Sequence, residues 1–156
     1  MKNISSRTQT NDFNLCLIKF ISKSPNLFPT IKEIEFLTDV AVSYSDLIPI
    51  PLIEVRIDDS NFTRFIRYIE SSCDVIEELN QKPIMGALPS LPREQYPKLE
   101  FYLDKDITTF YFDFNGSTPD HLKLRPILRY LKKKKVLERT FIYGINCKPQ
   151  KDKKSI

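Results

Sequence analysis

The chain has 156 residues, of which 41% are apolar and 28% charged, as expected of one globular domain large enough to bury a core. It holds only 3 glycines, at positions 86, 116 and 144, which argues against the glycine-rich loops of P-loop and dinucleotide-binding proteins. The net charge of +4 is uneven, because residues 1–80 carry 8 basic and 12 acidic side chains whereas residues 81–156 carry 16 basic and 8 acidic ones.

One folded domain is expected, with a polar extension at each end. Residues 1–12 are mostly polar and are predicted to form a disordered N-terminal arm. The basic residues 148–156 are predicted to form a disordered tail. The α/β domain between them, over residues 13–147, opens with the apolar run 13–21, whose partial alternation indicates a strand.

A capped helix and two strands are predicted next. Thr30 and Glu33 have the spacing of a capping box, so a short helix is expected to begin at Thr30 and to reach residue 37. The apolar residues 40–44 then predict a buried strand. Residues 52–57 predict another one, which begins only after two prolines that cannot pair in the middle of a sheet.

The clearest helix of the sequence begins at Ser60. Its apolar side chains recur at spacings of four, three, four and three, which places them on one helical face. The opposite face carries charged side chains, among them Arg64 and Arg67, as expected of a surface that contacts solvent. The apolar residues of this stripe are Phe62, Ile66, Ile69, Cys73 and Ile76.

From residue 82 onward, predicted strands alternate with predicted helices. Apolar runs over residues 82–89, 107–116 and 140–147 indicate three strands, and amphipathic stretches over residues 91–106 and 117–135 indicate the helices between them. Apolar strands separated by helices of this length are typical of a parallel sheet with helical crossovers.

The spacing of these units favours an incomplete TIM-barrel-like fold. A complete (β/α)₈ barrel takes about 250 residues, so four or five strand–helix units make about half to five eighths of one. Such a half could be completed by a second chain, or it could be part of a longer barrel protein. The alternative is an open parallel sheet of the flavodoxin-like or doubly wound type.

Polar residues follow several of the predicted strands, at the side of a parallel sheet where ligands bind. Asp113 is the candidate catalytic residue, because a carboxylate that points into a barrel must be paired or functional. Arg56, Asn115, Asn146 and Cys147 are the candidate ligand-binding residues. The competing interpretations are that Asp113 caps a helix or pairs with Arg56, and that Cys147 is an inert thiol.

Several other classes of site receive no support from the sequence. Cys16, Cys73 and Cys147 are too far apart for a CxxC metal site and too few for a disulfide framework. The only histidine, His121, rules out a His-rich metal centre, and no motif indicates a cofactor. The longest apolar run, residues 47–53, is far shorter than the ~20 residues of a membrane span, so a cytoplasmic location is expected.

Two classes of function are compatible with these patterns. The first is an enzyme module of the barrel type with its site at the strand ends, for which an RNA- or tRNA-modifying enzyme would also explain the basic half. The second is a non-catalytic module that binds RNA, another protein or a second copy of itself. Weak nucleic-acid binding is assigned to the basic run, although cations also suit the last turn of a helix. That run consists of Lys132, Lys133, Lys134 and Lys135.

Overall fold

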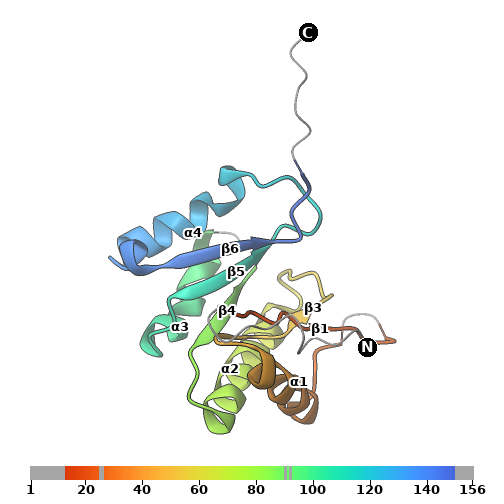
Figure 1. The fold of residues 1–156 in the computed structure, drawn as a ribbon. Coiled ribbons are helices and arrows are strands. Elements are labelled where there is room, and N and C mark those ends of the chain that lie inside the picture. Colours follow the sequence, from red (N-terminus) through yellow and green to blue (C-terminus); the bar gives the residue numbers. More distant parts are fainter. Residues whose placement is uncertain (1–12, 25–26, 90, 92, 150–156) are drawn as a thin grey trace.

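The structure is a computed structural model that describes residues 13–24, 27–89, 91 and 93–149. Helices and strands alternate along the chain (Figure 1). The elements are β1 (Lys19–Phe20), α1 (Ile31–Tyr44), β2 (Ile48–Pro49), β3 (Leu52–Ile53), α2 (Phe62–Leu79), β4 (Ile84–Leu88), the 3₁₀ helix η2 (Arg93–Leu99), α3 (Glu100–Asp104), β5 (Thr109–Asp113), α4 (His121–Lys133), the 3₁₀ helix η3 (Leu137–Arg139) and β6 (Phe141–Ile145). The arm predicted for residues 1–12 and most of the predicted tail lie outside the described residues.

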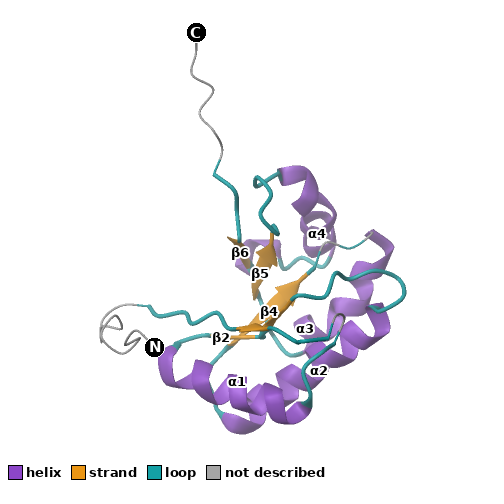
Figure 2. Ribbon diagram, turned by 90° about the vertical axis from the view of Figure 1, so that its right-hand side faces the viewer, coloured by secondary structure: helices purple, strands orange, loops and turns teal. Residues whose placement is uncertain are grey.

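The main sheet contains four parallel strands in the order β2-β4-β5-β6. This confirms the predicted parallel sheet alternating with helices. The strand order follows the chain without a reversal, and Figure 2 shows α2, α3 and α4 on one side of the sheet. Within the described ranges β2 and β6 do not pair with each other, so the sheet is open and these strands do not close a barrel.

Helix α1 begins as predicted but continues seven residues further. Thr30 caps it by accepting a hydrogen bond from the N–H of Glu33 at 3.4 Å, and the Glu33 carboxylate accepts the N–H of Thr30 at 2.6 Å. The strand predicted over residues 40–44 is wrong, because this segment is the end of α1. The buried positions Ile34, Thr38 and Ala41 show the reason: they keep a helical spacing of four and three past residue 37.

The strand predicted over residues 52–57 is also wrong in its extent. The chain joins the main sheet before residue 52, at β2. There the N–H groups of Ile48 and Ile50 donate to the carbonyls of Pro83 and Met85. Pro49 is tolerated because β2 is an edge strand and the proline nitrogen faces away from β4. Only residues 52–53 form a strand, β3, and it pairs with β1 in a separate two-stranded parallel sheet.

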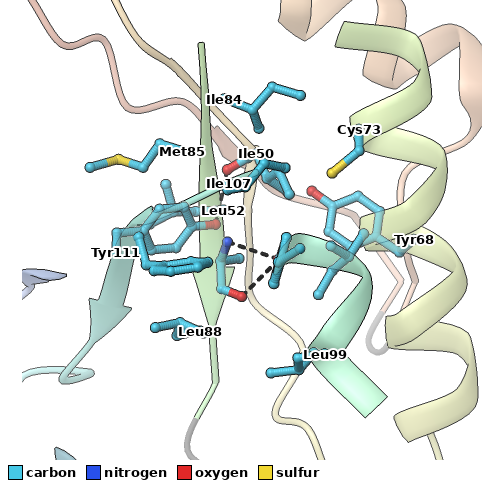
Figure 3. Packing of buried hydrophobic residues seen from close by; sticks show 14 of the residues in the cluster. Ile50, Leu52, Tyr68, Cys73, Ile84, Met85, Leu88, Leu99, Ile107 and Tyr111 are labelled. Carbon is cyan, nitrogen blue, oxygen red and sulfur yellow. Dashed lines mark hydrogen bonds between the residues drawn. The ribbon is translucent and has the colours of Figure 1, made fainter. Parts of the chain in front are cut away.

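Three buried tyrosines bond to backbone groups near the end of β2, two of them to the segment that links the two sheets and one to β4. The hydroxyl of Tyr111 donates to the carbonyl of Ile50 at 2.9 Å, and that of Tyr68 donates to the carbonyl of Pro51. The Tyr102 hydroxyl both accepts the N–H of Ala87 at 3.0 Å and donates to its carbonyl at 2.9 Å, beyond the point where β2 ends. Figure 3 shows Tyr111 on one side of β4 and Tyr68 on the other, next to α2. Residues 52–57 are thereby held beside the ends of β4 and β5.

Helix α2 contributes the largest apolar face of the core. Phe62, Ile69, Cys73 and Ile76 of the predicted stripe are buried, and Ile66 is half-buried. The face is wider than the stripe, because four further side chains of α2 are buried with it: Phe65, Tyr68, Ser72 and Val75.

Candidate functional site

A cavity of about 750 Å³ lies at the carboxyl ends of β4 and β5, within the usual size range of small-molecule sites. It is lined by the irregular segment 52–57, by the ends of the two strands and by Lys123 in the first turn of α4. Its lining includes apolar side chains and charged ones of both signs, the charged residues being Lys19, Glu54, Arg56, Asp113 and Lys123. The location is the one predicted for a ligand site.

Asp113 lies at the end of β5, where its carboxylate is fixed by two hydrogen bonds. Its Oδ1 accepts the N–H of Asn115 at 2.7 Å and the side-chain amide of Asn146 at 3.0 Å. Both asparagines adopt left-handed backbone conformations, with φ of 50° and 51°, which asparagine tolerates better than most residues. Among the described residues no donor reaches Oδ2 of Asp113, so this oxygen remains available to a ligand.

The competing roles considered for Asp113 are not the ones observed. The cap of α4 is Asp120, whose Oδ1 accepts the N–H of Leu122 at 2.8 Å. Arg56 forms no ion pair with Asp113, and no other Lys or Arg in the described part of the chain does so. Asp113 is therefore held by neutral donors at the cavity wall, without an ion-pair partner among the described residues.

Two cations of the cavity form no salt bridge among the residues that the structure describes, although Arg56 is near enough to Asp58 to help lower the pKa of that carboxyl. Arg56 is exposed, and its carbonyl accepts the Asn61 amide at 2.8 Å, which ties this backbone to the start of α2. Lys123 donates to the hydroxyl of Ser117 at 2.6 Å, which does not neutralise its charge. In contrast, Lys19 is paired with Glu54 at 3.0 Å.

The structure brings together some of the predicted site residues and separates others. Arg56, Asp113 and Asn115 all line the cavity, and Asn146 is joined to it only through its hydrogen bond to Asp113. Cys147 is exposed and does not line the cavity; its thiol is 3.7 Å from the carbonyl of Ile145.

The basic run lies at the other end of the sheet. Because α4 runs antiparallel to the strands, its last turn lies near the start of β6, whereas the cavity lies at the strand ends. Lys134 forms an ion pair with Glu100, and Lys132, Lys133 and Lys135 are exposed without an ion-pair partner in the described residues. The basic run therefore does not contribute to the cavity.

Sequence reasoning missed Lys19, Glu54 and Lys123. Lys123 could have been found, because the helix that follows a strand starts at the end of the sheet where that strand finishes, and residue 123 lies in the first turn of α4. Lys19 gives no such signal, since it reaches the cavity only through the pairing of β1 with β3.

Comparison of the chain with models of known protein families, with curated proteins and with solved structures gives no match. Within the described ranges, no group of three or more carboxylates, thiols or imidazoles is placed to hold a metal ion. No helix in the described part of the chain is long and apolar enough to cross a membrane.

Proposed function

We propose that this chain binds a small anionic molecule at the carboxyl ends of its parallel strands. The observation that carries the proposal is that Arg56 and Lys123, which form no salt bridge among the described residues, lie in the same cavity as the Asp113 carboxylate, which forms none either. Arg56 and Lys123 would hold a phosphate or carboxylate group of the ligand. Asp113 Oδ2 would accept a hydrogen bond from a hydroxyl or amino group elsewhere on the same molecule.

The arrangement of the sheet supports this location. Strands in chain order with helices on one side are the pattern of a (β/α) barrel segment, and in barrels the ligand binds at the carboxyl ends of the strands. We therefore propose the finer description of an incomplete barrel-type module, rather than a doubly wound sheet, in which strand order reverses at the binding crevice.

Binding is favoured over catalysis by the neighbours of Asp113. A general base is usually oriented by, or exchanges protons with, a second titratable group. Asp113 receives only amide donors, and the single histidine lies within 3.6 Å of Asp120 and does not line the cavity. In an enzymatic role, Asp113 would have to act as a lone general base that takes a proton directly from the substrate, without a second titratable residue beside it.

The proposal is tested by NMR titration with inorganic phosphate and with a hexose phosphate. Amide shifts are expected at residues 54–57, 113–117 and 121–123. Arg56→Gln and Lys123→Gln should each weaken both ligands by about tenfold, the effect of removing one charge-assisted hydrogen bond worth about 1.4 kcal/mol. Asp113→Asn should weaken the hexose phosphate more than inorganic phosphate, because only the sugar offers hydroxyl donors.

Lys133→Gln is the matched control, since it removes an exposed lysine from the other end of the same helix. It should leave both affinities unchanged. If the shifts map away from the cavity, or if Arg56→Gln and Lys133→Gln behave alike, the cavity is not the binding site.

A further inference from the structure

Strand β6 leaves one edge of the main sheet unpaired among the described residues. It is the outermost strand of the main sheet in Figure 1. Its side chains are unusually exposed for an apolar strand. Phe141 is 62% exposed and Tyr143 is 44% exposed. Unprotected apolar edge strands pair readily with another strand.

The backbone of β6 offers hydrogen-bonding groups at two alternate positions. The N–H of Phe141 donates to the carbonyl of Thr108, and the carbonyl of Ile145 accepts the N–H of Phe114, so residues 141, 143 and 145 bond to β5. Ile142 and Gly144 consequently direct their N–H and C=O groups outward. Beyond β6, the N–H of Lys148 donates to the carbonyl of Ser117, which carries the chain back toward β5, so that none of the described residues pairs with the outer edge of β6.

We infer that this edge pairs with β6 of a second copy of the chain, antiparallel and centred on Tyr143. A two-fold axis at Tyr143 places Ile142 of one copy opposite Gly144 of the other, twice, so all outward backbone groups of these residues are satisfied. The Ile142 side chain of one copy then lies opposite Gly144 of the other, where the Phe114 ring covers the glycine and offers an apolar contact. A strand that is complementary to itself in this way needs no different partner.

On the other face of β6, the same two-fold axis brings apolar side chains of the two copies opposite each other. Phe141, Tyr143 and Ile145 share the face that is opposite to the one Phe112 occupies. Phe141 of one copy lies opposite Ile145 of the other, and the two Tyr143 rings meet at the axis in a non-hydrogen-bonded pair, where cross-strand side chains are closest.

The opposite edge of the sheet favours a second copy joined at β6 over a head-to-tail arrangement. Completing a barrel with a second chain would require β6 of one copy to pair with β2 of the other. The outward position of β2 is Pro49, which has no N–H to donate, and Pro51 follows it. Of the two edges of the main sheet, only β6 is therefore suited to pairing, and an assembly through this edge closes at two copies.

Sedimentation equilibrium of the full chain over micromolar to millimolar concentrations tests this inference. The wild type should be a dimer at the upper end of this range. Tyr143→Lys should raise the dimer dissociation constant at least tenfold, because two like charges would meet at the axis. Phe36→Lys, which alters a 67%-exposed ring on α1, should leave the constant unchanged and controls for a general loss of surface apolarity.

A cross-linking experiment fixes the register. Tyr143→Cys in a Cys147→Ser background should form an intermolecular disulfide on mild oxidation, because facing non-hydrogen-bonded positions bring Cβ atoms near disulfide range. Phe36→Cys in the same background should not cross-link. A wild type that is monomeric at millimolar concentration, or a dimer that Tyr143→Lys leaves intact, would overturn the inference.

Discussion

Buried tyrosine hydroxyls complete the hydrogen bonding of this fold where its strands end. After Ile50 the chain leaves β4, and the next residue, Pro51, has no N–H, so nearby backbone groups lose their strand partners. Tyr68, Tyr102 and Tyr111 replace those partners. Burial raises the pKa of each phenol well above 10, so all three remain protonated donors wherever the protein is folded near neutral pH.

Tyr111→Phe should therefore destabilise the protein although it removes a single oxygen atom. The Ile50 carbonyl would be left buried and unsatisfied, which costs about 1–3 kcal/mol. Urea unfolding at pH 7 measures the change. Tyr143→Phe, which removes an exposed hydroxyl, is the control and should change the free energy of unfolding by less than about 0.5 kcal/mol. Equal effects of the two substitutions would show that the Tyr111 hydrogen bond does not contribute to stability.

At the scale of elements, α2 is the helix against which the sheet and α1 pack. Its buried face includes Ile69, Cys73 and Ile76, all fully buried, and its exposed face carries Arg64 and Arg67. Burial raises the pKa of the Cys73 thiol to about 12, so this cysteine is a packing residue and not a nucleophile.

Ile69→Ala should lower the free energy of unfolding by about 2–5 kcal/mol, because it removes methyl groups from the packed face and leaves a cavity. Chemical denaturation followed by circular dichroism gives the value. Arg67→Ala, two residues away on the exposed face, should stay within about 0.5 kcal/mol of the wild type. A loss under about 0.5 kcal/mol for Ile69→Ala would mean that this face of α2 is not core.

The elements that could be predicted from the sequence are those with a strong period or a complete cap. The stripe of α2, the capping box of α1 and the apolar runs of β4, β5 and β6 all have local causes. Residues 40–44 were misassigned because two valines raise strand propensity, whereas the tertiary contacts of Thr38 and Ala41 extend the helix. The boundaries of β2 and β3 depend on which sheet each segment joins, and a short apolar run carries no such information.

At the scale of the molecule, the same distinction applies to the candidate site. Asp113, Asn115 and Arg56 could be placed together because parallel strands direct their carboxyl ends to one side. Lys19 could not, since its position depends on a pairing between segments that are more than thirty residues apart. The cavity is built partly by long-range contacts, and its charge balance therefore becomes visible only in the folded chain.

Cationic side chains gather in two regions at opposite ends of the sheet. The first is the cavity, where Arg56 and Lys123 lie with the acidic Glu54 and Asp113, and the second is the end of α4. We predict that single-stranded RNA binds at the second region without sequence preference, since exposed lysines attract phosphates through charge alone. Lys134 is not expected to contribute, because its ammonium group is paired with Glu100.

A triple variant with glutamine at the three unpaired lysines of this run, Lys132, Lys133 and Lys135, should weaken RNA binding. The slope of log affinity against log salt should fall by about 0.7 for each phosphate that is no longer neutralised, or by roughly 2 in all. Filter binding at several salt concentrations measures both quantities. Arg56→Gln with Lys123→Gln removes nearly as much positive charge from the other end of the sheet and should leave the slope unchanged. If the triple variant keeps the wild-type slope, RNA contacts another surface; if both variants lower the slope in proportion to the charge removed, net charge and not position governs the binding.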